Sequence, residues 1–294
     1  MCDFLYYFLP RYYQTHDKQA SNMESLRLIC LTLFFFFLST TANARESIKK
    51  NIWEMGVGIT TFSLPLYPGS SQRDVFTIPF PFFHIQSEYL DIDDGVRGFF
   101  FESPDIRLTV SGDIGVPVDS GDSVIRQGMP DLDAVLQIGP SLEFVFAGGR
   151  RQPSEFRFEL PLRAAIATDF SSYESAGLIL EPRLTYETLR PFESGFNYQV
   201  SAGLQFTTED YNAYYYDVAP EFATAERPAF TSKSGYNSFF IEMSANIRKG
   251  DLVYFAFTRY RSLKGSVIED SPLVEQNDSL SLGIGIVWIF ANSL

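Results

Sequence analysis

Hydrophobic and polar residues alternate strictly along much of the chain from Trp53 onward. Between 196 and 206 every even position is apolar, and the odd positions between them are Asn, Gln, Ser or Gly. Successive side chains of a β-strand point to opposite faces, so each set belongs to one face of a strand. The alternation recurs at 156–166, 178–187 and 239–248. Such strands run about 10 to 13 residues, the length that a tilted membrane strand needs.

The pattern predicts twelve strands, with ten as the alternative. The doubtful part is 88–102, where Asp91, Asp93, Asp94 and Gly95 either form a turn between two short strands or interrupt one long strand. Short connections at 148–154, 190–194 and 248–251 contrast with long polar ones at 112–130, 207–235 and 263–278, as expected for a barrel with one periplasmic and one exterior end. The predicted strands are 52–63, 75–86, 88–93, 96–102, 105–112, 132–147, 155–168, 177–188, 195–207, 236–248, 251–262 and 279–290.

Three features favour an all-β, antiparallel transmembrane barrel over a soluble β-sandwich. Many polar-face positions are Gly, Ser, Asn, Gln or Thr, which suit a confined lumen better than a water-exposed surface. Aromatic residues gather near strand ends, as in interfacial girdles. The last strand, 280–290, is apolar on one face and ends near Trp288 and Phe290, similar to the C-terminal insertion signal of outer-membrane proteins. We therefore expect residues 45–294 to form one barrel domain in the outer membrane of a Gram-negative cell.

The first 44 residues are expected to be removed. Met23 is followed by Arg27, an apolar run at 28–38 and Ala42-Asn43-Ala44, which is the pattern of a cleavable signal peptide. Residues 1–22 precede it, so Met23 is the expected true start. A membrane helix is the alternative, but it needs about 20 apolar residues, and this run has roughly half that. Both cysteines lie in the removed part, so the mature chain is expected to hold no disulfide.

Charge and composition exclude several function classes. The net charge is −13, which makes nucleic acid an improbable partner. The mature chain holds one histidine, His84, and no nucleophile motif to pair with it. It also offers no metal-ligand spacing. We therefore expect no enzyme activity, no catalytic residue, no metal and no cofactor.

Charged residues of both signs fall on the inward faces of neighbouring strands. Paired across a lumen of ten to twelve strands, they would form a cross-linked plug. The alternative is a small-solute channel whose selectivity these residues set. The predicted lumen charges are Arg157, Glu159, Arg163, Glu181, Arg183, Glu187, Glu242 and Arg248.

The long loops supply candidate binding residues. They are acidic, which either serves solubility or helps to hold the divalent cations that bridge lipopolysaccharide, although no ligand spacing defines a site. The longest loop is rich in tyrosine, and exposed tyrosines often anchor partners; packing of the loop onto the barrel rim is the equal alternative. The binding candidates are Tyr67, Asp210, Tyr211, Tyr214, Tyr215 and Tyr216.

Several short motifs follow one another along the mature chain: Gly56-Val57-Gly58, the segments 65–70 and 78–81, Asp210 to Tyr215, and 270–274 before the final strand. In their order and spacing they resemble the MipA/OmpV family, the outer-membrane group that includes the MltA-interacting protein. The resemblance covers nearly the whole mature chain. It implies an outer-membrane scaffold that joins a lytic transglycosylase to a bifunctional penicillin-binding protein in peptidoglycan assembly, with no catalytic residue. Other members of the family look like adhesins, so a surface adhesin remains an alternative.

Overall fold

The computed structural model describes residues 52–86, 90–92, 96–149, 152–169, 171–188 and 195–293. All of them belong to one compact unit, Lys49–Leu294. The predicted signal peptide and the proposed start at Met23 lie outside the described residues. None of the described helices is long and apolar enough to cross a membrane.

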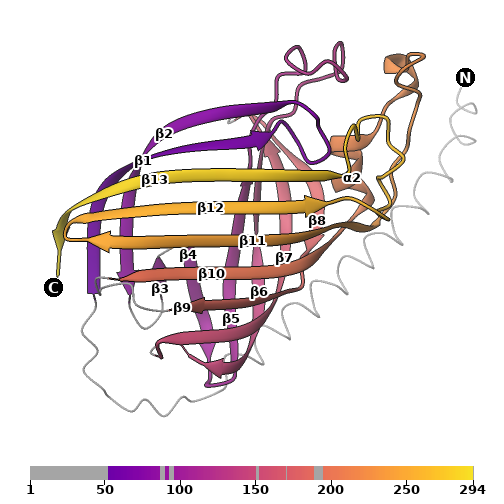
Figure 1. Ribbon diagram of the computed structural model, residues 1–294. Helices are drawn as coiled ribbons and strands as arrows, with labels where there is room; N and C mark the ends of the chain where they lie inside the picture. The colour runs from indigo at the N-terminus through magenta and orange to yellow at the C-terminus, as the bar shows by residue number, and fades with distance from the viewer. Residues whose placement is uncertain are drawn as a thin grey trace, which may run out of the picture. The chain divides into compact units, whose positions relative to one another are not determined.

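The regular secondary structure of the described chain consists almost entirely of strands that run antiparallel to their neighbours (Figure 1). The two helices, α2 (Glu209–Tyr216) and η1 (Pro220–Phe222), lie in one long loop. The strands are β1 (Ile52–Pro65), β2 (Arg73–Gln86), β3 (Leu90–Ile92), β4 (Val96–Glu102), β5 (Ile106–Gly115), β6 (Ala134–Gly148), β7 (Ser154–Thr168), β8 (Tyr173–Leu180), β9 (Arg183–Thr188), β10 (Phe196–Thr207), β11 (Gly235–Lys249), β12 (Leu252–Ser262) and β13 (Asp278–Asn292).

The sheet closes on itself. β1 pairs with both β2 and β13, and β10 pairs with β11 as well as with β8 and β9. β8 and β9 are two parts of one wall element, because both lie between β7 and β10. The break falls at Glu181 and Pro182, where proline cannot donate a ladder hydrogen bond. Counted in this way the barrel has twelve strands, which confirms the prediction.

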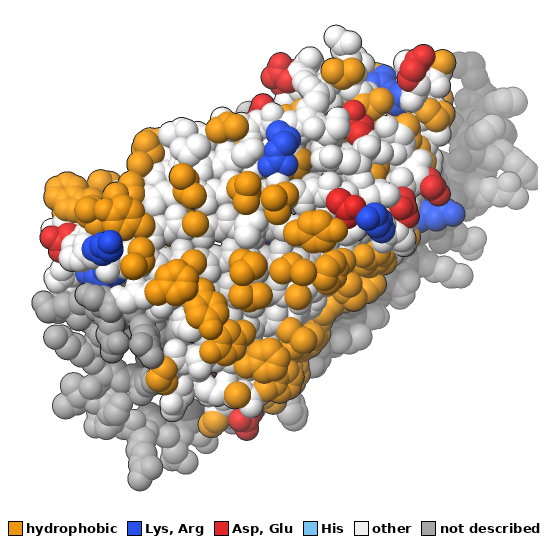
Figure 2. Space-filling model, viewed as in Figure 1, with side chains coloured by type: hydrophobic (Ala, Val, Ile, Leu, Met, Phe, Trp, Pro, Cys, Tyr) orange, Lys and Arg blue, Asp and Glu red, His pale blue; other side chains and the backbone are white. Residues whose placement is uncertain are grey.

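The barrel is apolar outside and polar inside. On β10 the apolar set, from Phe196 to Phe206, faces outward, with Phe196 61 % exposed, while Ser201 and Gln205 of the alternate set are buried. Figure 2 shows apolar side chains spread over the outer face of β11–β13 and β1, with most charged side chains toward the two ends. Such a surface fits lipid and not water, because large exposed apolar areas are rare on soluble monomers.

The two ends of the barrel differ. The turn end carries the N-terminus of β1 and the C-terminus of β13, where Glu54 pairs with Asn292, together with short turns such as Gly250–Asp251. The other end carries the long loops 66–72, 116–133, 208–234 and 263–277 (Figure 1). In single-chain bacterial barrels both termini and the short turns face the periplasm.

The four long loops meet in a compact apolar core, which we call the cap. The hydroxyl of Tyr216 on α2 donates to the carbonyl of Pro68 at 2.8 Å, and that of Tyr67 donates to the carbonyl of Leu273 at 2.9 Å. The cap also packs on the upper ends of β6–β8, and α2 contacts β8. The largest apolar cluster of the described chain therefore lies at the mouth of the barrel. Its buried members from the loops are Tyr67, Val118, Leu132, Tyr211, Tyr215, Tyr216, Val218, Leu263, Ile268 and Leu273.

Candidate functional site

One half of the lumen, formed by β5–β9, is filled by an ion-pair network, which we call the charged half. Arg157 lies at its centre and is 1 % exposed. Its guanidinium donates to Glu159 at 2.8 Å and lies 2.6 Å from Glu187 and 3.1 Å from Glu155. The alternation along β7 places Glu155, Arg157 and Glu159 on the same inner face, where they face the charges of neighbouring strands.

The network continues along the barrel wall in both directions. Arg183 donates to Glu159 at 2.6 Å, and Arg163 lies 2.9 Å from Glu181. On the other side Arg107 pairs with Glu143 and Glu155. The charged half thus contains six of the eight predicted lumen charges.

The remaining two predicted lumen charges lie on β11 and have partners outside the charged half. Glu242 accepts from Arg259 at 2.6 Å, and Arg248 donates to Glu54 at 2.7 Å near the turn end. Asp113 also approaches Arg259, at 3.7 Å. The placement of Asp113 in a loop was wrong: β5 continues to Gly115, and Asp113 faces the lumen.

The opposite half of the lumen, formed by β1, β2, β12 and β13, is lined by phenylalanine rings, and we call it the aromatic half. The rings lie flat against neighbouring glycines. A Cβ on Gly58 would lie 2.6 Å from Phe80 Cζ, and one on Gly283 would collide with the ring of Phe257. Each ring therefore occupies the space that a side chain would take at the neighbouring glycine, and it does not extend across the lumen.

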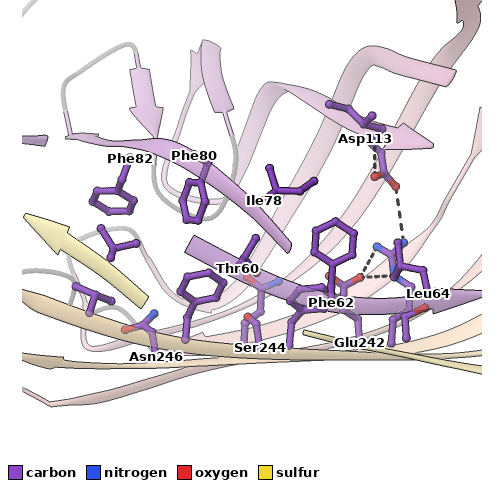
Figure 3. A pocket seen from close by; sticks show the side chains of 18 of the residues that line it. Thr60, Phe62, Leu64, Ile78, Phe80, Phe82, Asp113, Glu242, Ser244 and Asn246 are labelled. Atoms are coloured by element: carbon purple, nitrogen blue, oxygen red, sulfur yellow. Dashed lines mark hydrogen bonds and ion pairs between the residues drawn. The ribbon is translucent and has the colours of Figure 1, made fainter. Parts of the chain in front are cut away.

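A cavity of about 790 Å³ lies beside the rings (Figure 3). Figure 3 shows Phe80, Phe82 and Ile78 on one side, and the ion pairs of Glu242 and Asp113 on another. The cavity extends from Leu64 below the cap to Glu54 near the turn end. Its volume is in the range of small-molecule sites.

Four tyrosines are packed inside the cap and are not exposed on its surface. Tyr67, Tyr211, Tyr215 and Tyr216 are all buried. For the three that belong to the longest loop, burial matches the alternative of packing onto the barrel rim and not that of exposed anchors, and a binding role of any of the four stays a prediction. Their phenol rings close the loop core, and burial raises the pKa of each phenol.

Tyr214 and Asp210 are less enclosed. Tyr214 is half-buried and donates to the carbonyl of Asp133 at 3.2 Å; desolvation raises its pKa to about 12. Asp210 is exposed in the first turn of α2. These two are the binding candidates that the fold leaves accessible.

Polar groups that sequence reasoning missed also line the lumen. Arg107, Glu143 and Glu155 are buried there. His84, recognised from the sequence as the one histidine of the predicted mature chain, is also buried and lies opposite Glu54 on the paired strands β1 and β2. The parity of each alternating strand was the available signal, since these residues share the inward positions of their strands. Among the described residues, no three His, Cys, Asp or Glu side chains are grouped to hold a metal ion.

A closed antiparallel sheet with an apolar outside and a charged inside defines the class: this is an outer-membrane β-barrel protein. Among solved structures the chain is similar to the translocator domain of autotransporter NalP from Neisseria meningitidis, with 9 % identity, 95 % of this chain and 98 % of that chain covered, and a TM-score of 0.37. It is also similar to the toluene transporter TbuX of Ralstonia pickettii, with 9 % identity, coverage of 87 % and 93 %, and a TM-score of 0.30.

A family assignment follows from the sequence match. The family model described as MltA-interacting protein MipA matches residues 57–290, and the chain belongs to this family. Comparison with curated proteins gives no match. The protein is an outer-membrane protein of the Gram-negative envelope.

Proposed function

We propose that this protein is a non-enzymatic scaffold of the outer membrane that joins a lytic transglycosylase to a penicillin-binding protein in peptidoglycan assembly. The observation that carries the proposal is the family match over 57–290, since the family is described by its interaction with MltA. The partners work on the cell wall and would meet the turn end of the barrel, which faces the periplasm.

The barrel architecture supports an anchor more than a conduit. The cap places a packed apolar core at the mouth, and the charged half cross-links one side of the lumen. An open small-solute channel would need both to rearrange. The surface-adhesin alternative loses its main support, because the loop tyrosines are mostly buried.

The turn between β11 and β12 offers a surface to test. Lys249 and Asp251 are exposed on either side of Gly250, so their charges can be reversed without disturbing the lumen. Rim charges steer association and contribute to specificity between partners. Lys264 is a matched control, since it is an exposed lysine at the cap end, where it donates to Asp278.

The experiment is affinity capture from detergent-solubilised envelopes, with the recovered proteins identified by mass spectrometry. We expect the unaltered protein and K264E to recover a murein hydrolase or synthase, and the double variant K249E/D251K to recover several-fold less. Recovery of only the barrel-assembly machinery and lipopolysaccharide by the unaltered protein would contradict the scaffold proposal.

A further inference from the structure

The lumen cavity has an apolar and a polar side. The apolar side is lined by Phe80, Phe82 and Phe255. The rings of Phe80 and Phe255 pack edge to face, with their centroids 6.1 Å apart. Ser244 and Asn246 of β11 lie on the polar side (Figure 3). A cavity that combines aromatic faces with a few polar groups fits a ring-bearing molecule with a polar head.

The charge of the lining favours a cationic head. Glu187 lines the cavity but is already paired with Arg157 of the charged half. Three further carboxylates line it, those of Glu54, Asp113 and Glu242, against two guanidinium groups, those of Arg248 and Arg259. Asp113 and Glu242 both approach the single guanidinium of Arg259, at 3.7 and 2.6 Å. Carboxylates in excess over arginines attract an ammonium group, and the neighbouring ring faces add cation–π attraction.

The wall beside the aromatic half has a gap in its pairing. β3 pairs only with Ile85 and Gln86 of β2, and β4 pairs with β5 only as far as Thr109. Within the part of the chain that the structure describes, no strand therefore pairs with the outer edges of β2 over 73–84 and β5 over 110–115. We call the space between these edges the lateral window.

Proline at two positions of β2 is consistent with an unpaired edge. β2 carries Pro79 and Pro81. Both residues are paired with β1, and the register between the two strands does not shift at either of them. Their missing N–H groups thus belong to the edge that faces the window, where proline costs no ladder hydrogen bond. By contrast, the β6–β7 pairing is interrupted at Pro140, between the pairs Ile138↔Ala164 and Ser141↔Pro161.

Exposure shows that the cavity reaches the window. Ile78 shares the inward face of β2 with Phe80 but is 44 % exposed. Ile114 points outward from β5, is 68 % exposed, and still lines the cavity. At the cap end the window is bounded by loop 116–133, where the Gln72 side-chain amide donates to the carbonyl of Asp122 at 2.9 Å.

We propose that the lumen cavity binds apolar, ring-bearing molecules with a cationic head group, which reach it from the lipid through the lateral window. The rings would pack against the phenylalanine faces, and the ammonium would lie toward the carboxylates of Asp113 and Glu242. The route avoids the cap, which closes the mouth of the barrel.

Binding is tested with three probes that share one ring system: 2-naphthylmethylammonium, 2-naphthylmethanol and 2-naphthoate. Each is titrated calorimetrically into the protein in lipid nanodiscs, and the heat of partition into empty nanodiscs is subtracted. We expect the ammonium to bind at least about tenfold more tightly than the carboxylate, with the alcohol between them. Equal or tighter binding of the carboxylate would overturn the proposed selectivity.

Two tryptophan variants separate the cavity from the lipid surface. S244W fills the cavity from β11, whereas A245W adds the same side chain to the outer face of the same strand. We expect S244W to weaken ammonium binding by more than about tenfold and A245W to leave it within twofold. The heat-dependent shift of its gel migration shows whether S244W is folded. If the folded variant binds the ammonium as well as the unaltered protein does, the cavity is not the site.

The route is tested with lipid-borne quenchers. Cys2 and Cys30 are replaced by serine, and a fluorescent label is attached to single cysteines at Ile78, Ser244 or Ile59. Ile59 faces outward, and Ser244 lines the lumen wall away from the window. Brominated lipid should quench the labels at Ile78 and Ile59 strongly and that at Ser244 weakly. A label at Ile78 quenched no more than that at Ser244 would overturn the lateral route.

Discussion

The charged and aromatic halves of the lumen occupy the interior of one barrel in opposite ways. In the charged half, long side chains from adjacent strands end on one another, and Arg157 and Glu155 are almost fully buried. In the aromatic half the ring of Phe80 lies along the wall over Gly58. The neighbours of each inward residue thus decide how much of the lumen its side chain fills. A charge of opposite sign draws a side chain into the lumen, whereas a neighbouring glycine lets a ring lie flat against the wall.

The same contrast extends to the surroundings of each half. The cap packs on the upper ends of β6–β8, which belong to the charged half. The lateral window lies between β2 of the aromatic half and the cap end of β5, at the border of the charged half. One side of the barrel is therefore cross-linked and covered, while the other holds the cavity and an unpaired edge.

The largest expected effect comes from removing the central cation of the charged half. R157M leaves the carboxylates of Glu155, Glu159 and Glu187 buried without their shared partner, which should cost about 3–5 kcal/mol of unfolding free energy. R259M should cost only about 1 kcal/mol or less, because Glu242 and Asp113 are partly exposed to the lumen. Urea unfolding in lipid vesicles measures both, and equal losses would erase the distinction between the halves.

A methyl group on the wall tests the aromatic half. In G283A the new Cβ collides with the Phe257 ring, which must swing into the cavity, at a cost of about 1–3 kcal/mol. G112A is the matched control, since its Cβ would meet only the carbonyl of Gln137 at 3.5 Å and should cost less. Urea unfolding of the two variants supplies the comparison. If both variants are equally stable, the ring is not held against the glycine.

A smaller effect is expected where the cap is held together by a single hydroxyl. Y216F leaves the carbonyl of Pro68 without its 2.8 Å donor and should weaken cap closure by about 1 kcal/mol. The readout is the rate at which protease cleaves loop 208–234 of the folded barrel, and we expect it to rise about fivefold. An unchanged rate, with the barrel folded, would show that the cap does not depend on this contact.

The alternation of the strands predicted most of the wall, because residue parity alone decides which face a side chain takes. Phe196 and Ser201 of β10 lie outside and inside as their parity requires. The pairing partners were not predictable in the same way. That Arg157 meets Glu187 of β9 depends on the register between strands, which no single segment specifies.

The errors also have physical causes. Asp113 follows Gly112, a pair typical of turns, but an inward carboxylate opposite Arg259 is stable within a strand. Tyr211, Tyr215 and Tyr216 of α2 look exposed in a polar loop, and they are buried only because four loops distant in sequence converge on them. The broken strand at Pro182 was missed because the alternation continues through it.

High pH should open the cap without a matching change in either half of the lumen. Near neutral pH this effect on cap closure is the smallest of those predicted. Closure of the cap keeps its phenols neutral, and the pKa of Tyr214 rises from 10.0 to about 12. A phenol whose pKa is higher in the closed state stabilises that state fully below pH 10, where neither state ionises, and this contribution is lost as the pH rises through 12. Protease cleavage of loop 208–234 should therefore stay constant up to pH 10 and then accelerate, in step with the absorbance of tyrosinate. The variant Y214F should shift the acceleration to higher pH, because one phenol no longer ionises. Acceleration that begins below pH 10 would mean that groups other than the buried tyrosines hold the cap closed.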